Sequence, residues 1–224
     1  MRKSTYFIGS LLVLITLVLS CSKSEDSPAV DSYAAIKAEF GTTIDPANLA
    51  NYAAQPKPAY IVKDNTGGNA ITNTKATLGR VLFYDKNLSI DNTVSCGSCH
   101  KQEFAFSDTA LVSDGVSGGV TGRHSMRLIN ARFAVESKFF WNERAATLEI
   151  QTTQPVQDHA EMGFSGQNGR PGIATLLTKL QAIPYYKELF RFVYGDETIT
   201  ELRLQECLAQ FVRSIQSFDS KYDA

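Results

Sequence analysis

The sequence has few of the side chains that form disulfide bonds in small exported domains or bind metal ions. Its 224 residues include four cysteines, three histidines and one tryptophan. Lysine and arginine number 22 against 23 acidic residues, so there is no basic excess and nucleic acid is not an expected partner. About two hundred residues can bury the core of one domain without disulfide bonds. Composition alone does not indicate a function, whereas local sequence motifs do.

The N-terminus predicts export. Residues 1–20 join a short basic start to an apolar run too short for a comfortable membrane span, which is typical of a signal peptide. The run ends before Cys21 in an order that resembles a bacterial lipobox, whose cysteine is acylated; an ordinary cleaved signal with an incidental cysteine is the alternative. Residues 21–32 are polar, so we expect a flexible tether. The expected location is the periplasm or cell envelope, with membrane contact only through a lipid on Cys21.

Two of the other cysteines precede a histidine in the pattern Cys-x-x-Cys-His. With Cys21 acylated, three cysteines remain, an odd number that does not suit a disulfide framework. The spacing of Cys96, Cys99 and His100 is typical of one covalent haem c, held by two thioether bonds with His100 as proximal iron ligand. Export agrees with this interpretation, because c-type haem is attached outside the bacterial cytoplasm.

Two other uses of these residues fit less well. A thioredoxin-like redox pair would lie in a βαβ pattern, which is missing here, and would leave His100 without a role. A zinc site needs two more ligands, yet His124 and His159 lie outside zinc-finger spacing. The last cysteine, Cys207, follows a helical pattern and is expected to be a free, partly buried thiol.

Hydrophobic spacing predicts a mainly α-helical, cytochrome c-like haem domain with long loops over residues 33–224. Leu78, Val81 and Leu82 share one helical face just before the haem motif, and residues 107–122 form a glycine-rich loop after it. Further helices are expected around residues 146–153, 172–182, 185–193 and 199–218, with Pro155 and Pro184 as their stops or starts.

The second axial ligand of the haem iron would separate an electron carrier from a catalyst. Met162 follows His100 at a separation that fits the distal methionine of a small electron-transfer cytochrome c. Met126, His124 and His159 are the other candidates. Spacing alone does not choose among them, because an isolated methionine is more often core filler than ligand.

Several longer motifs recur in a recognisable order from about residue 70 to the end of the chain. They read "LGRVLFYD", "SCGSCHKQEFAFSD", "GRHSMRLINARF" and "FFWNERAATLEIQTTQPVQDHAEMGF". This order resembles the N-terminal, peroxidatic half of bacterial di-haem cytochrome c peroxidases and the related methylamine-utilisation di-haem proteins. The resemblance implies reduction of hydrogen peroxide with electrons from a small donor protein, a cytochrome or a cupredoxin.

The resemblance also assigns catalytic roles. It places Glu161 and Gln151 over an open iron face, Trp141 between two haems, and Met162 beside the glutamate without a bond to iron. The chemistry agrees, because a carboxylate can take a proton from one peroxide oxygen and return it to the other. The amide of Gln151 can hold peroxide or water without titrating.

Three features depart from the family pattern. Val116 stands where many members have a histidine that binds the resting iron, so we expect an open haem. His124 replaces a calcium-binding asparagine, which makes calcium doubtful. The chain has one Cys-x-x-Cys-His where the family has two, so we expect a fragment without the second haem domain. The open alternatives are a mono-haem electron-transfer cytochrome, with Met162 or His124 as sixth ligand, and a protein-modifying oxidase of the methylamine-utilisation type.

Overall fold

Seven helices joined by long loops make up the part of the chain that the structure describes. The computed structural model describes residues 32–134, 138–218 and 220–221, and residues 33–224 form one unit. The signal peptide and Cys21 lie outside the described residues. The helices are α1 (Ala34–Phe40), α2 (Asn73–Tyr84), α3 (Cys96–Cys99), α4 (Leu148–Gln157), α5 (Ile173–Gln181), α6 (Pro184–Tyr194) and α7 (Glu201–Ser214).

The mainly helical prediction is confirmed, since the described residues pair as strands only in isolated bridges. The helix expected around residues 199–218 is shorter and ends at Ser214. Pro184 does start a helix, as expected, but Pro155 was wrongly predicted as a boundary and lies inside α4. A proline so near the end of a helix removes a single backbone hydrogen bond, so the last turn of α4 still forms. Cys207 is fully buried rather than partly buried.

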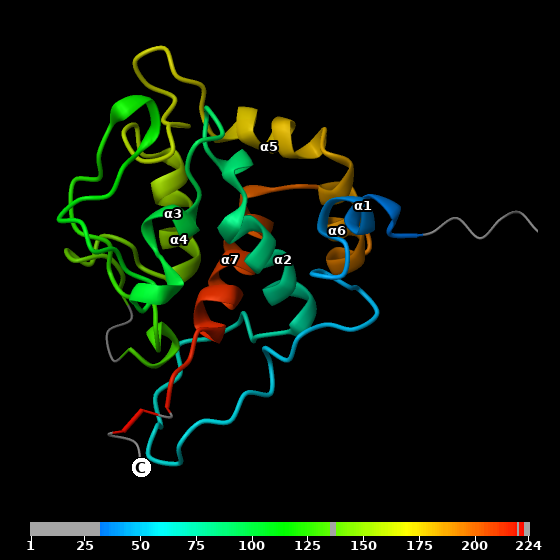
Figure 1. Ribbon diagram of the computed structural model, residues 1–224, viewed down its shortest axis with the longest axis vertical. Helices are drawn as coiled ribbons and strands as arrows, with labels where there is room; N and C mark the ends of the chain where they lie inside the picture. The colour runs from blue at the N-terminus through cyan, green and yellow to red at the C-terminus, as the bar shows by residue number, and fades with distance from the viewer. Residues whose placement is uncertain (1–31, 135–137, 219, 222–224) are drawn as a thin grey trace, which may run out of the picture. The chain divides into compact units, whose positions relative to one another are not determined.

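Helices α2 and α7 pack directly on each other at the centre of Figure 1. The close approach occurs at Gly79, where an added Cβ would lie 2.0 Å from the carbonyl oxygen of Cys207. Leucines of both helices, such as Leu78 and Leu204, are almost fully buried around this crossing. The two helices therefore form the centre of the core.

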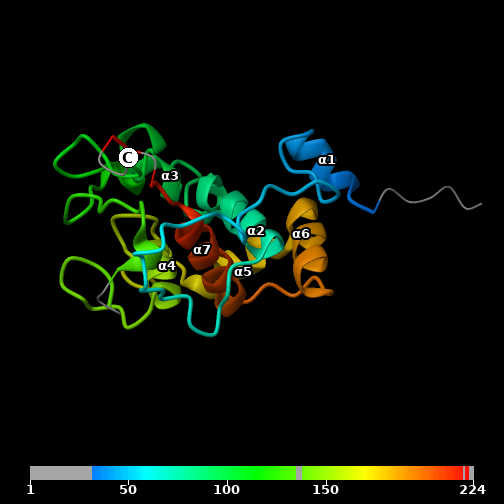
Figure 2. The ribbon, with the colours of Figure 1, turned by 90° about the horizontal axis from the view of Figure 1, so that it is seen from below.

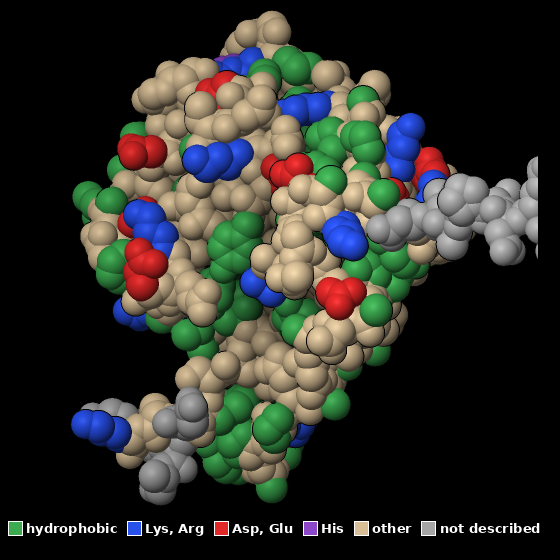
Figure 3. Space-filling view, turned by 45° about the vertical axis from the view of Figure 1, so that its right-hand side comes forward, with side chains coloured by type: hydrophobic (Ala, Val, Ile, Leu, Met, Phe, Trp, Pro, Cys, Tyr) green, Lys and Arg blue, Asp and Glu red, His purple; other side chains and the backbone are tan. Residues whose placement is uncertain are grey.

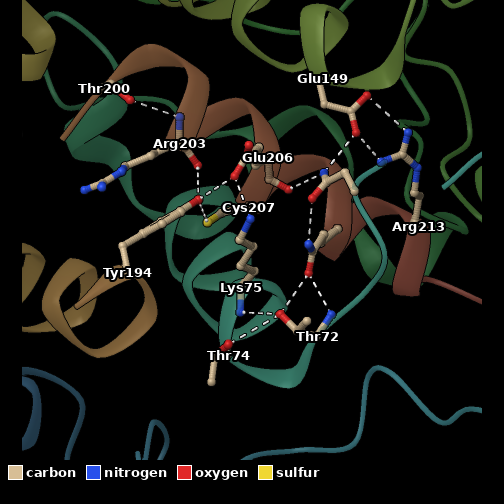
Figure 4. Close-up of polar contacts among 12 residues, drawn as sticks. Thr72, Thr74, Lys75, Glu149, Tyr194, Thr200, Arg203, Glu206, Cys207 and Arg213 are labelled. Carbon is tan, nitrogen blue, oxygen red and sulfur yellow. Dashed lines mark hydrogen bonds and ion pairs between the residues drawn. The ribbon is translucent and has the colours of Figure 1, made fainter. Parts of the chain in front are cut away.

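Polar side chains tie α7 to three other helices (Figure 4). Lys75 of α2 pairs with Glu206 of α7 at 2.6 Å, and the hydroxyl of Tyr194 in α6 lies 3.0 Å from the same carboxylate. Arg213 near the end of α7 pairs with Glu149 of α4. Because these groups are largely shielded from water, they fix the orientation of α7 more firmly than exposed ion pairs would.

The long loops between α3 and α4 gather around α3, at the end of the unit opposite α1 and α6 (Figures 1 and 2). The face in Figure 3 carries interspersed basic and acidic side chains rather than a patch of one sign. Within the described ranges, no helix has both the length and the apolar character to cross a membrane. The end of the unit formed by these long loops contains the Cys-x-x-Cys-His turn and is therefore the candidate functional region.

The α2–α7 contact generates a stability prediction. Gly79→Ala should lower the free energy of unfolding by about 1–3 kcal/mol, because the new methyl group would overlap the backbone of α7. Gly122→Ala is the matched control, since a Cβ there meets no atom within 4 Å, and it should change stability by less than about 0.5 kcal/mol. Urea unfolding measures both. Equal stabilities for the two variants would show that the helices can separate without cost.

Candidate functional site

The Cys-x-x-Cys-His motif forms one turn of helix. Ser95 caps α3, and its backbone N–H donates to the Ser98 hydroxyl at 3.0 Å. This turn places Cys96 and Cys99 three positions apart on one helical face, with both thiols half-buried and free of disulfide bonds. The two sulfur atoms are therefore presented together, as attachment to a single macrocycle requires.

The imidazole of His100 is held by a hydrogen bond to the backbone. Its Nδ1–H donates to the carbonyl oxygen of Phe106 at 2.9 Å. Phe106 reaches this position with a φ of 55°, a strained value for a residue other than glycine. Iron-binding histidines typically use such a backbone carbonyl to fix their tautomer and ring orientation. Burial lowers the pKa of His100, which favours the neutral imidazole that iron binds.

Glu161 lies close to this turn. Burial raises the pKa of Cys96 to about 12, and the charges of Cys99 and Glu161 contribute to that rise. Burial also raises the pKa of Cys99, again with a contribution from Glu161. The glycine-rich loop links the two regions, because the Asp114 carbonyl oxygen lies 3.8 Å from Cys99 Sγ and Val116 N–H lies 3.1 Å from the Glu161 carbonyl oxygen.

A turn and a loop hold Glu161 in place. The Asp158 carboxylate accepts hydrogen bonds from the backbone N–H groups of Ala160 at 2.8 Å and Glu161 at 3.0 Å. The glycine-rich loop packs against this turn, because Val116 N–H lies 3.1 Å from the carbonyl oxygens of both residues. A Cβ on Gly115 would be 1.9 Å from the Ala160 oxygen, so only glycine allows this approach.

The pKa of the Glu161 carboxyl group is shifted by its surroundings. It is half-buried, and burial together with the charge of Asp158 raises its pKa, while Arg144 opposes the rise. A carboxyl group whose pKa is raised towards neutrality can both accept and return a proton. Burial and a raised pKa are the properties that an acid–base role for Glu161 would require.

Gln151 lies in α4, ten residues before Glu161. It is half-buried, and among the described residues its side-chain amide has no hydrogen-bond partner. Pro155 lacks the N–H that would normally bond to the Gln151 carbonyl, so this backbone oxygen also loses its helical donor. Gln151 thus has free polar groups, but no hydrogen bond joins it to Glu161 within the described ranges.

Trp141 and His124 are linked at the surface. Trp141 is 60% exposed, and its indole N–H donates to the His124 carbonyl oxygen at 2.9 Å. The imidazole of His124 lies between the Ala110 carbonyl, at 2.9 Å from Nδ1, and the Ser107 hydroxyl, at 3.2 Å from Nε2. Both ring nitrogens are therefore engaged by the loop that follows the haem motif.

Some contributors to the site were not foreseen from the sequence. Ser95 and Ser98 carry a capping pattern that could have been noticed beside the cysteines. Asp158 stands three residues before Glu161, a spacing that favours a side-chain-stabilised turn. Phe106 gave no signal, because its role depends on a backbone carbonyl and on a φ that phenylalanine rarely adopts.

Comparison with known proteins gives one consistent result. A family model described as di-haem cytochrome c peroxidase matches residues 73–224. The methylamine utilization protein MauG of Methylophilus methylotrophus is 32% identical over 155 residues, which cover 69% of this chain and 44% of that protein. The cytochrome c551 peroxidase of Nitrosomonas europaea is 28% identical over 174 residues, 78% of this chain and 48% of that protein.

A solved structure shares the fold. The crystal structure of a MauG-like protein associated with microbial copper homeostasis aligns with a TM-score of 0.63 and 31% identity, covering 75% of this chain and 48% of that one. The chain thus spans about half the length of the curated relatives it matches. The family match covers α2 to α7 and the Cys-x-x-Cys-His turn, since it begins at Asn73, the first residue of α2.

The raised pKa of Glu161 predicts a pH-dependent stability difference. Below the ordinary carboxyl pKa the group is protonated in both folded and unfolded chains; as pH rises through the raised folded pKa, the folded state must bury a charge and loses stability. The melting temperature of Glu161→Gln should therefore rise relative to that of the wild type as the pH increases above the ordinary carboxyl pKa. Thermal unfolding of the haem-free chain measures this. The exposed Glu103→Gln serves as the charge-removal control, and a Glu161→Gln difference as flat as that control would contradict the assignment.

Proposed function

Because the chain belongs to the di-haem cytochrome c peroxidase family, we propose that it is a peroxidatic haem domain that reduces hydrogen peroxide to water. The electrons come from a small donor protein, a cytochrome or a cupredoxin. The observation that carries this proposal is the half-buried Glu161 carboxyl group with its raised pKa, held next to the Cys-x-x-Cys-His turn. The proposal concerns this chain, which matches about half of its relatives' length.

The residues of α3 fit a haem c. Cys96 and Cys99 would hold it through thioether bonds, and the imidazole of His100, whose Nδ1 is bonded to the Phe106 carbonyl, would bind the iron. Bound there, the haem supplies the iron that exchanges electrons with peroxide. Before attachment, the raised pKa values of both thiols keep them protonated, which disfavours competing reactions of the thiolate.

Glu161 would move the proton. Over the full reaction peroxide takes up two electrons and two protons and leaves as two water molecules. The Glu161 carboxylate accepts a proton from one peroxide oxygen and returns it to the other, which leaves as water. The raised pKa makes the carboxylate a stronger base than an ordinary one, which favours acceptance of the proton from peroxide. The unpartnered amide of Gln151 would hold peroxide or water in position for this transfer.

We further propose that the chain works outside the cytoplasm. Residues 1–20 would direct export, and a lipid on Cys21 would retain the protein at the cell envelope. This location agrees with the haem assignment, since covalent haem c and an exported chain require the same compartment.

Oxidation of a protein partner is the second candidate function. The observation that favours it is Trp141, which is 60% exposed while its indole N–H is fixed by a backbone carbonyl. An aromatic ring held at the surface can receive an electron from a docked protein. The two functions share the haem and Glu161, and differ in whether a small redox protein or a modified partner is the electron source.

Haem attachment can be tested directly. Expression in a bacterium with the c-type maturation machinery should give one haem-sized mass increment per chain, which survives denaturation because thioether bonds are covalent. Mass spectrometry of the denatured protein measures it. The Cys96→Ala, Cys99→Ala double variant should lose the increment, whereas Cys207→Ala should retain it because that thiol is buried between α7 and α6. A native chain without covalent haem would refute the assignment.

The role of Glu161 predicts a rate. Glu161→Gln keeps the size of the side chain and removes the base, so it should slow peroxide-driven haem oxidation by about 10²- to 10⁴-fold while leaving haem content unchanged. Stopped-flow absorbance follows the reaction. Glu103→Gln, an exposed carboxylate in the loop after His100, should react at nearly the wild-type rate. Similar rates for the two variants would remove Glu161 from the mechanism.

A further inference from the structure

A pair of buried tyrosines shares one carboxylate oxygen. The Oδ2 atom of Asp85, the residue after α2, accepts hydrogen bonds from the hydroxyl groups of Tyr185 at 2.8 Å and Tyr186 at 2.7 Å. The two rings have centroids 4.7 Å apart. Tyr186 is fully buried and Tyr185 is 9% exposed. Neither tyrosine has a part in the peroxide chemistry described above.

This pair lies next to the haem-binding turn. Phe83, two residues before Asp85, has its ring 6.4 Å from the imidazole of His100. The ring of Tyr84 packs against Gly97, where an added Cβ would come within 2.6 Å of it. Cys96 contributes electrostatically to the environment of the Tyr186 phenol. The last turn of α2 therefore connects the tyrosine pair with the residues that would carry the haem.

The shared carboxylate matters for redox chemistry. When a phenol loses an electron it becomes strongly acidic, so in a buried site its oxidation requires a proton acceptor within hydrogen-bond distance. Burial, followed by the charge of Asp85, raises the pKa of Tyr186 well above its ordinary value, so the resting phenol keeps its proton. Asp85 is the acceptor placed to receive that proton, at 2.7 Å.

Trp141 and Tyr194 differ from Tyr186 in this respect. The indole N–H of Trp141 donates to a peptide carbonyl, which cannot take up a proton. Tyr194 does lie 3.0 Å from a carboxylate, but Glu206 is already paired with Lys75 (Figure 4). Tyr194 is also separated from Tyr186 by the ring of Phe190, with centroid distances of 6.0 and 6.5 Å. It is therefore a suitable control for the pair.

We propose that Tyr186, in ring contact with Tyr185 and hydrogen-bonded to Asp85, is a redox-active tyrosine that supplies one of the two electrons taken by peroxide. The inference rests on the proposed peroxidase function. One electron leaves the haem and one leaves Tyr186; the phenolic O–H bond breaks, and its proton bonds to the Asp85 carboxylate. Two electrons from the donor protein then restore the haem and the phenol, and Asp85 returns the proton to Tyr186. Together with two protons from solvent, these electrons account for the reduction of peroxide to two waters.

Rapid freezing and electron paramagnetic resonance test the proposal. The haem-loaded chain is mixed with hydrogen peroxide, frozen, and examined for a tyrosyl radical. Growth on ring-deuterated tyrosine should narrow the radical signal in the unmutated chain. Tyr186→Phe should abolish the tyrosyl signal while the optical change of the haem persists. Asp85→Asn should lower the radical yield with the phenol still present, and Tyr194→Phe should leave the signal unchanged.

The outcomes separate the two proposals. Haem oxidation without a deuterium-sensitive radical, or a signal that persists in Tyr186→Phe, overturns the tyrosine assignment and leaves the peroxidase function intact. A haem that does not react with peroxide overturns both. If Tyr186→Phe fails to fold, as judged by circular dichroism and haem content, deuteration and Asp85→Asn decide: a narrowed signal that falls in Asp85→Asn supports the assignment, and any other result overturns it.

Discussion

The close approach of α2 and α7 is the constraint on which the rest of the molecule depends. Because Gly79 has only a hydrogen atom as its side chain, the backbones of α2 and α7 are in contact. An aromatic side chain near the end of α2 then packs against the phenylalanine of α7. Phe83 then lies between Phe211 and the imidazole of His100. A wider crossing would separate these rings. The position of the haem-binding turn is therefore set by helix packing at a distance from it.

Loops rather than helices complete the site, and they do so through backbone groups. The carbonyl of Phe106 orients His100, and the N–H of Val116 binds the turn that carries Glu161. Buried backbone groups of this kind need partners, so each loop is held where its own polar atoms are satisfied. The same loop therefore contacts both the turn that carries Glu161 and the Cys-x-x-Cys-His turn.

Periodic features could be predicted from the sequence, because the core leucines of α2 and α7 follow the helical repeat. The covalent haem indicated by the Cys-x-x-Cys-His spacing stays a prediction. Other features depend on residues distant in the chain. Helix α1 was missed because its first N–H groups, at Ala35 and Ile36, are bound by the carboxylate of Glu188 more than 150 residues away. Asp85 and Tyr186, too, meet across about one hundred residues, which no local pattern reveals.

The tether between Trp141 and His124 has an optical consequence. Trp141 is the sole tryptophan of the chain, so the intrinsic indole fluorescence of this protein comes from a single surface position. The hydrogen bond to the His124 carbonyl fixes that fluorophore to the loop that follows the haem-binding turn. The wavelength of its emission reports how exposed the indole is to water, and a nearby haem would quench the fluorescence by energy transfer. The protein therefore carries a built-in, label-free probe of whatever covers this part of its surface.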